Sequence, residues 1–473
     1  MGSEAAESLD ILNDTDRHAY ESLRRRPSAR ADRYALGRSL RKKVPRSSLG
    51  EWRVSRDDRN PIALVEESHE GRISDLVPVR VARMADSPYG FLRGSAVVMA
   101  SDVAGLPATG IMPVVCGDAH LGNVGFYASP ERDLVLDLND FDEAHTGSWE
   151  WDLRRLVAST WVAGRHNGST EEQCEEAVLA CARSYREEMR HLANQPLFTR
   201  SFERIDITRM AEHAPGSPLT VELERAAKRA RERTSDRALP RFTTEHQGER
   251  QIVEEPPLIT RLSSAEAGML AEGLDEYLNT LDAHWRRVLG GYTLVDVAHK
   301  VVGVGSVGLR AYVALLEGSS EDDVIFLQLK QARRSVLAKY VHGDNAWHRH
   351  QGERVVEYQR ALQTVSDPLL GWTTVDDRQF YVRQFRNMKG SVSLDEISAR
   401  ALAEYAGIAG HLLAKGHART SGASIIAGYV GGGTVLDKAM ARFAQAYADQ
   451  TEADHVALLA AVKSGRMRIA EGV

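Results

Sequence analysis

The chain has 473 residues, of which 43% are hydrophobic and 27% charged, a composition typical of a globular protein with a substantial core. Its net charge of −6 gives no reason to expect a nucleic acid as partner. The three cysteines lack Cys-x-x-Cys spacing, which argues against a disulfide framework or a cysteine metal site. Neither a secretory h-region nor an apolar run of about 18 residues occurs, so we expect no membrane partner and, by exclusion, a cytoplasmic location.

Taken in chain order, four segments differ in character, and together they predict an α+β fold. They are a charged arm with short helices (1–75), a segment with short strand-like runs and long helices (76–288), a glycine-containing β-rich segment (289–386) and a second helical segment (387–473).

The densest group of polar side chains lies in two loops, at residues 117–123 and 137–143, separated by a hairpin-like insert. Phosphoryl transfer needs a carboxylate that accepts the hydroxyl proton and oxygen ligands that hold Mg²⁺. Asp118 followed five residues later by Asn123 fits a loop with one base and one ligand. Asp140 follows the next short strand and is expected to place a second carboxylate beside the first.

The roles of the neighbouring polar residues are less specific. Asp142 is expected as a further metal ligand, while Asp137 and Glu143 either add to a second metal or cap the next helix. We expect His120 to brace the loop by hydrogen bonding and Asp152 to pin the loop as a buried carboxylate.

A glycine-rich segment is expected to contact phosphates through Gly303, Gly305, Ser306 and Gly308. The Gly-x-Gly-x-x-Gly spacing alone is shared by dinucleotide-binding folds and kinases. Here the glycines precede two β-like runs, at 309–316 and 324–329, rather than a helix. The pattern therefore predicts the kinase arrangement, with ATP as the nucleotide and a strand lysine on its phosphates.

That strand lysine is Lys330, and it requires a glutamate from the following helix. Glu353 and Glu357 lie one turn apart on a predicted helix at 346–364, and the spacing does not choose between them. In the strand predicted at 379–385, we expect the backbone at Val382 and Gln384 to bind the adenine.

The loop at Asp118 resembles that of the aminoglycoside and choline kinase-like superfamily. The shared pattern is Gly-Asp-x-His-x-x-Asn, then a strand and Asp140, then an aromatic-Asp-Leu triplet, with Asp152 twelve residues later (152 − 140 = 12). The resemblance implies that Asp118 is the base, that Asn123 and Asp140 hold Mg²⁺, and that the fold is a two-lobed protein kinase-like one. Because Lys330 follows Asp140 by 190 residues (330 − 140), it also implies circular permutation, with the catalytic loop before the nucleotide-binding lobe.

Most of the chain also resembles a bacterial family of unknown function, DUF2252. The matching text lies at residues 83–84, 87–89, 91–94, 116–120, 138–143, 300–308, 354–356 and 447–450. This resemblance implies kinship and names no substrate.

The expected function is phosphate transfer from MgATP to an unidentified small-molecule or protein hydroxyl. The alternatives are a nucleotide-binding regulatory module without transfer activity, and an AMP transferase. We expect helices between about 170 and 290 to line the acceptor site. Arg80, Arg83 and Arg93 either bind an anionic substrate or clamp the acidic loop, and the clamp is the favoured interpretation.

Overall fold

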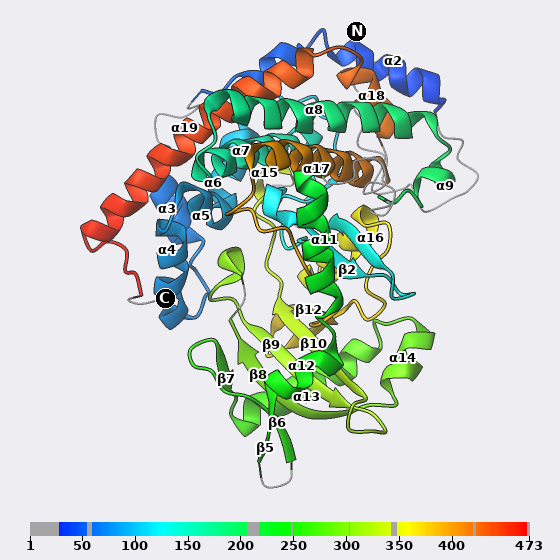
Figure 1. Ribbon diagram of the computed structural model, residues 1–473, viewed down its shortest axis with the longest axis vertical. Coiled ribbons are helices and arrows are strands. Elements are labelled where there is room, and N and C mark those ends of the chain that lie inside the picture. Colours follow the sequence, from blue (N-terminus) through cyan, green and yellow to red (C-terminus); the bar gives the residue numbers. More distant parts are fainter. Residues whose placement is uncertain are drawn as a thin grey trace.

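A computed structural model of the chain describes residues 28–53, 59–205, 217–246, 249–301, 303–341, 348–419 and 422–470. It is a mixed α+β fold, with a helical part above an antiparallel sheet in Figure 1. No described helix is long and apolar enough to cross a membrane.

The main sheet has six strands in the order β11-β12-β10-β9-β8-β7, and every neighbouring pair is antiparallel. The predicted hairpin is present, because the acidic and glycine-containing turn after Glu317 brings Val324 opposite it. The strands are β7 (Ile259–Arg261), β8 (Thr293–Lys300), β9 (Ala311–Glu317), β10 (Val324–Gln331), β11 (Gly371–Val375) and β12 (Arg378–Gln384).

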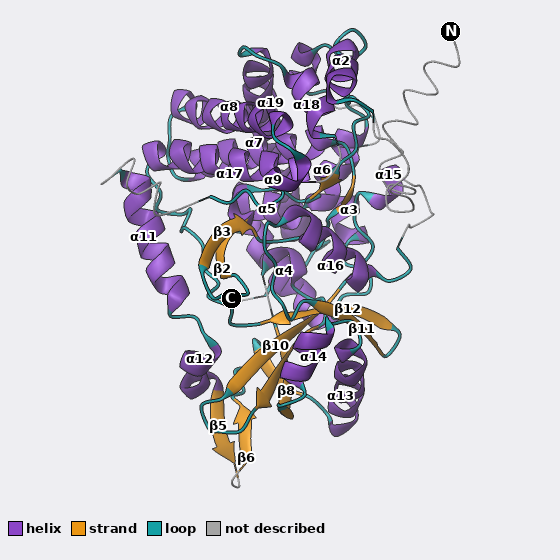
Figure 2. Ribbon diagram, turned by 90° about the vertical axis from the view of Figure 1, so that its right-hand side faces the viewer, coloured by secondary structure: helices purple, strands orange, loops and turns teal. Residues whose placement is uncertain are grey.

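The two faces of this sheet have different neighbours. Helices α13 (Ser264–Leu278) and α14 (Ala283–Leu289) cover the face away from the helical part, whereas α16 (Gln351–Leu362) lies between the sheet and that part (Figure 2). Since β7 and α13 precede residue 289, the β-rich unit begins earlier than the boundary expected there. The change of character near Gly290 that suggested the boundary marks the start of β8, which lies beside the edge strand β7.

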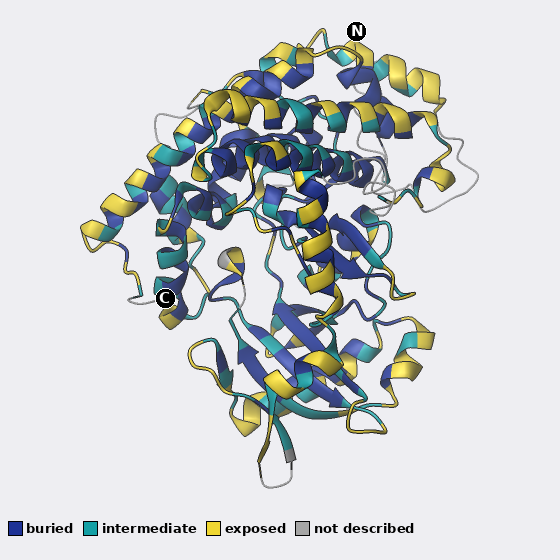
Figure 3. Cartoon of the chain, viewed as in Figure 1, coloured by how far each residue is buried: buried dark blue, intermediate teal, exposed yellow. Residues whose placement is uncertain are grey.

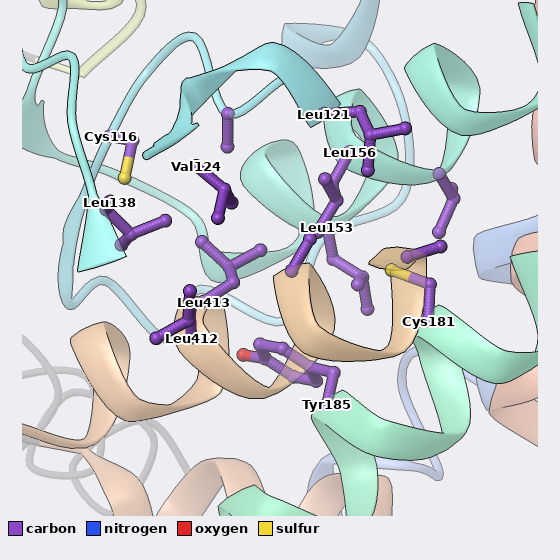
Figure 4. Packing of buried hydrophobic residues seen from close by; sticks show 14 of the residues in the cluster. Cys116, Leu121, Val124, Leu138, Leu153, Leu156, Cys181, Tyr185, Leu412 and Leu413 are labelled. Atoms are coloured by element: carbon purple, nitrogen blue, oxygen red, sulfur yellow. The ribbon is translucent and has the colours of Figure 1, made fainter. Parts of the chain in front are cut away.

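The helical part is built around α7, whose residues are almost all buried between longer helices (Figure 3). Its principal members are α7 (Trp149–His166), α8 (Glu171–Asn194), α17 (Ala399–Arg419), α18 (Ala423–Val430) and α19 (Val435–Lys463). Helix α17, from the second helical segment, packs along α8 and beside the early hairpin of β2 (Val124–Ala128) and β3 (Leu134–Leu138). Figure 4 shows Leu412 and Leu413 of α17 beside Val124 and Leu138 of that hairpin.

Shorter elements complete the described chain. The remaining helices are α2 (Arg30–Leu40), α3 (Pro61–Glu67), α4 (Val77–Ala85), α5 (Pro88–Gly94), α6 (Ala96–Ala104), α9 (Leu197–Arg200), α11 (Pro218–Arg231), α12 (Ser235–Phe242) and α15 (Ala338–Val341). The remaining strands are β1 (Val114–Val115), β4 (His145–Thr146), β5 (Thr243–His246) and β6 (Glu249–Ile252). Helices α2 and α3 agree with the short helices expected in the N-terminal arm, of which residues 1–27 and 54–58 lie outside the described chain.

Candidate functional site

A cavity of about 510 Å³ lies where the sheet meets the helical part. Eight of the residues expected to act as base, metal ligand or phosphate contact line it: Asp118, Asn123, Asp140, Asp142, Gly303, Gly305, Ser306 and Lys330. The structure thus brings the acidic loops and the glycine segment together, although more than 160 residues separate them along the chain (303 − 140 = 163).

The loop that carries Asp118 is held in place by a glycine and a buried carboxylate. Gly117 has φ +77°, and a Cβ there would lie 2.1 Å from the carbonyl oxygen of Glu143, so only glycine fits. The carboxylate of Asp152 accepts hydrogen bonds from the backbone N–H groups of Cys116 (2.6 Å) and Gly117 (2.9 Å). The expectation that Asp152 pins the loop is therefore confirmed.

Asp118 itself faces the cavity with one oxygen bound and one available. Its Oδ1 accepts a hydrogen bond from Nε (2.8 Å) of Arg155, a buried residue of α7, and lies 2.7 Å from Nη2 of the same side chain in an ion pair. Its Oδ2 has no hydrogen-bond partner among the described residues, so this oxygen is free to accept a proton from a ligand. Sequence reasoning missed Arg155, although its place one turn after Asp152 on the same helix was a usable signal.

Asn123 and Asp140 are neighbours because they flank the two ends of the β2–β3 hairpin. Val124 pairs with Leu138, and the N–H of the next residue, Asn139, donates to the Asn123 carbonyl at 2.9 Å. The Asn123 amide nitrogen donates to the Asp118 carbonyl at 2.6 Å, which leaves its side-chain oxygen free to act as a ligand. Burial and the nearby Asp142 carboxylate raise the pKa of Asp140, against the opposite effect of the Lys330 and Arg383 cations.

Lys330 forms an ion pair with Asp142 in this structure. The Asp142 carboxylate also accepts hydrogen bonds from Tyr381 Oη (2.8 Å) and Ser306 Oγ (3.1 Å). Although burial alone would lower the pKa of Lys330, the Asp142 carboxylate raises it above its ordinary value. The same lysine holds the pKa of Asp142 below its ordinary value, against the effect of burial. Both groups are therefore charged at neutral pH.

The expected helix glutamate does not pair with Lys330. Glu357 is exposed and lies 2.8 Å from His348, and Glu353 does not line the cavity. The two glutamates share a face of α16, as predicted, but the opposite face is the one that packs inward. From that inward face Arg354 reaches the backbone carbonyls of Asp142, Ala144 and Arg333.

Val382 and Gln384, expected to contact the adenine, do not line the cavity. Val382 is paired in the sheet with both Leu329 and Gly371, and the Gln384 N–H donates to Asp367 at 2.7 Å. At Val382 both neighbouring strands are paired, so its backbone groups are not available to a ligand.

Strand alternation determines which side chains of β12 reach the cavity instead. Lys330 lies opposite Tyr381 in the register, and side chains two apart on a strand share a face. Arg383 therefore points the same way as Tyr381 and lines the cavity, together with Phe385 and Lys389 just beyond the strand. The same alternation applied to the sequence could have identified Tyr381 and Arg383.

The glycine segment connects β8 to β9 and lies over the cavity. Gly308 has φ +87° and sits at the turn rather than in the cavity lining, whereas Gly303 and Gly305 line it. Arg72 donates hydrogen bonds to the carbonyls of Gly305 (2.9 Å) and Val307 (2.5 Å). An arginine from the N-terminal arm thus fastens this loop, a contact that the sequence did not indicate.

The neighbouring polar residues have structural roles. Burial lowers the pKa of His120 to about 3, and its Nδ1 accepts a hydrogen bond from the Gly122 N–H at 3.1 Å, which confirms that it braces the loop. Asp137 forms a buried ion pair with Lys415 of α17 and does not line the cavity. Glu143 lines the cavity and accepts a hydrogen bond from the Val336 N–H at 2.7 Å. Neither caps the following helix, whose N-cap is Ser148.

Two expectations about the acceptor side need correction. No described residue between 170 and 290 lines this cavity; α13 and α14 pack beneath the sheet, and Ala226 and Arg229 of α11 line a neighbouring pocket with Arg93 and Gly122. Arg155, rather than Arg80 or Arg93, holds Asp118, and Arg80 and Arg93 line the cavity without an ion pair to the acidic loops.

The family model "Uncharacterized protein conserved in bacteria (DUF2252)" matches residues 72–461. The chain belongs to this family. The match includes the acidic loops, the glycine segment, Lys330 and α17. No curated protein and no solved structure matches the chain significantly.

Proposed function

We propose that this DUF2252 protein is an ATP-dependent phosphotransferase with a circularly permuted, kinase-like two-lobed fold. It would transfer phosphate from MgATP to the hydroxyl group of an acceptor. The observation that carries the proposal is the convergence of Asp118, Asn123, Asp140, Lys330 and the glycine loop on one cavity.

The arrangement of the β-rich part supports the nucleotide half of the proposal. The glycine loop joins β8 and β9, and Lys330 lies on β10, the third strand of that series. In protein kinases a glycine-rich loop covers the phosphates and the phosphate-binding lysine is on the third strand, followed by a helix, as α16 follows here.

Chain order supports the permutation. After β12 the chain enters α17, whose His417 lies 3.2 Å from Asp152, the residue that pins the Asp118 loop. Helix α17 therefore contacts the residue that holds the catalytic loop, although the loop precedes His417 by nearly 300 residues (417 − 118 = 299). A kinase has the same sequence of sheet, helix and catalytic loop when its chain is read from the glycine loop onward.

The described side chains suit MgATP. The cavity volume of about 510 Å³ lies within the usual range for small-ligand sites, roughly 300–1,000 Å³. The free side-chain oxygen of Asn123 and the carboxylate of Asp140 are hard oxygen donors of the kind Mg²⁺ prefers. When bound, the metal would neutralise charge on the transferred phosphate. Asp118 would accept the acceptor's proton at Oδ2 while Arg155 holds Oδ1.

The ion pair of Lys330 with Asp142 is consistent with a nucleotide site in which Asp142 takes the place of the phosphates. Lys330 is almost fully buried, so it requires an anion in every state. Asp142 would serve as that anion until the phosphates of ATP take its place, after which the Asp142 carboxylate becomes available to the metal.

The test is incubation of the purified protein with MgATP, with measurement of nucleotide binding, phosphate release and self-modification. The Asp118→Asn variant removes the proposed base, and Asp133→Asn, an exposed position in the β2–β3 turn, serves as the matched control. We expect turnover in the wild type and in Asp133→Asn, with a loss of at least about 100-fold in Asp118→Asn.

Three outcomes would separate the alternatives. Binding without turnover in the wild type would indicate a regulatory module. A product heavier by about 329 Da rather than about 80 Da would indicate AMP transfer. Absence of nucleotide binding would refute the proposed function altogether.

A further inference from the structure

One end of the cavity is lined by arginines that lack acidic partners. Arg72 follows α3, Arg80 lies on α4, and Arg333 follows β10 just beyond Lys330. None of the three forms an ion pair with a described carboxylate, although all three line the same cavity. Three positive charges thus lie close together, two from the early helices and one from the end of β10.

Arg80 is the most unusual of the three. Its side chain is only 2% exposed, and its single hydrogen bond goes from Nη2 to the Gly94 carbonyl at 2.6 Å. Among the residues that the structure describes, its Nε and Nη1 have no hydrogen-bond partner. A buried guanidinium with two unused donors costs free energy, and such groups usually have a partner. Because Arg80 lines the cavity, an acceptor that enters the cavity could accept hydrogen bonds from these two donors.

The neighbours of Arg80 increase this need. Arg72 and Arg333 both donate to the Ser68 carbonyl, at 2.9 and 3.3 Å, which brings their guanidinium groups together. Burial lowers the pKa of Arg80 well below its ordinary value, and the positive charges of Arg72 and Arg333 lower it further. Burial and Arg333 likewise lower the pKa of Arg72, to about 10, although the carboxylates of Glu143 and Asp142 act in the opposite direction. A bound anion would relieve both effects.

The cations at the other end of the cavity are in a different situation. There Lys330 has Asp142 as its counter-ion, and both Asp140 and Asp142 raise the pKa of Arg383, against the effect of burial. Those cations face the residues proposed to bind the nucleotide. The cations around Lys330 therefore have counter-ions in the cavity, whereas Arg72, Arg80 and Arg333 form no ion pair with a described carboxylate.

We propose that Arg72, Arg80 and Arg333 form a second anion site, which binds a phosphate monoester group of the acceptor substrate. Three guanidinium groups present many more donors than one carboxylate can accept, whereas a doubly charged tetrahedral phosphate can take donors from several directions. The anion site stands on the arginines alone, while its assignment to the acceptor rests on the proposed function. The acceptor would thus be a phosphorylated alcohol whose free hydroxyl reaches Asp118.

The proposed anion site is also connected to the glycine loop through Arg72. Arg72 bonds the carbonyls of Gly305 and Val307 and also belongs to the arginine group. An anion on Arg72 would therefore stabilise the loop over the cavity.

The test measures binding of inorganic phosphate to the full chain without nucleotide, by calorimetry at constant ionic strength. Arg80→Met removes the charge and keeps most of the volume, and Arg333→Gln does the same at a half-buried position if Arg80→Met fails to fold. Arg154→Met is the matched control, because Arg154 is also fully buried, bonds only backbone carbonyls and does not line the cavity. Lys330→Met removes the cation proposed for the nucleotide.

We expect phosphate affinity to fall about tenfold or more in Arg80→Met and Arg333→Gln, and to stay unchanged in Arg154→Met and Lys330→Met. Loss of affinity in Lys330→Met alone would overturn the proposal, because phosphate would then occupy the nucleotide end. Equal losses in Arg80→Met and Arg154→Met would overturn it as well, since the effect would be structural.

A second arm identifies the source of the phosphate group. The titration is repeated with the protein saturated by a non-hydrolysable ATP analogue and Mg²⁺. If the site belongs to the acceptor, inorganic phosphate still binds. If the analogue abolishes phosphate binding, and Arg80→Met weakens the analogue but not ADP, the arginines bind the nucleotide's terminal phosphate and the acceptor assignment is wrong. Phosphate binding without any nucleotide binding would uphold the anion site while the proposed function fails.

Discussion

The buried ion pair between Lys415 and Asp137 connects α17 to the β2–β3 hairpin that precedes Asp140. The exposed fractions of the two side chains are 1% and 0%. The change Lys415→Met would leave the Asp137 carboxylate with only two backbone donors, the N–H groups of Leu138 (2.8 Å) and Thr364 (3.3 Å). Removal of one partner of a buried pair costs about 3–5 kcal/mol, because the remaining charge is desolvated and unpaired.

A second ion pair on the same helix gives the matched control. Arg400 and Glu404 lie 3.3 Å apart with exposed fractions of 77% and 31%. The change Arg400→Met should therefore cost about 0.3–0.5 kcal/mol, the usual value for an exposed helical pair. The structure thus predicts that Lys415→Met lowers the free energy of unfolding about ten times as much as Arg400→Met, although both changes lie on α17.

The assay is urea unfolding followed by tryptophan fluorescence, since Trp149 and Trp161 are buried in α7. The double change of Lys415→Met with Asp137→Leu should recover most of the lost free energy of unfolding, because no isolated charge remains. Losses within about 1 kcal/mol of each other for Lys415→Met and Arg400→Met would refute the reasoning.

Three further predictions concern the cavity. Burial raises the pKa of Glu143 to about 7 from its ordinary 4.5. Between these two values the native state holds a proton that the unfolded chain has lost. The free energy of unfolding therefore falls as the pH rises from about 4.5 to about 7. Thermal denaturation should show Glu143→Gln gaining stability over the wild type at pH 8 relative to pH 5, and parallel profiles would contradict this. Tyr381→Phe removes a hydrogen bond to the Asp142 carboxylate and should cost about 1.5–3 kcal/mol in chemical denaturation, less once Asp142→Asn is present. Gly117→Ala should reduce MgATP turnover strongly and lower the melting temperature, because its Cβ would overlap the Glu143 carbonyl; wild-type values for both would show that the loop has another conformation.

Much of the local structure was predictable, because it depends on residues close together in the sequence. The turn after Glu317 and the apolar runs on either side gave the β9–β10 hairpin, with Lys330 near its end. The two loops around Asp118 and Asp140 were identified from spacing alone, and the hairpin between them makes them neighbours. Their chemistry is set by residue type, so it needed no knowledge of the fold.

The partners of these residues were less predictable, because they come from distant segments. Spacing correctly put Glu353 and Glu357 on one face of α16. Packing, however, buries the face that carries Arg354 and leaves the two glutamates away from Lys330. The strand prediction for 379–385 was sound, yet it could not tell that β12 would lie between two strands and so have no free backbone groups for adenine at Val382.

Short-range periodicity and turn chemistry encode the carboxylate loops, the glycine loop and the lysine strand, so the sequence alone was sufficient to locate them. Only the tertiary structure decided that Asp142 is the partner of Lys330, that Arg155 holds Asp118, and that Arg72, Arg80 and Arg333 meet at one end of the cavity. The physical reason is that each of these contacts joins charges from different elements, and their geometry follows from how the sheet and the helices pack around a common core.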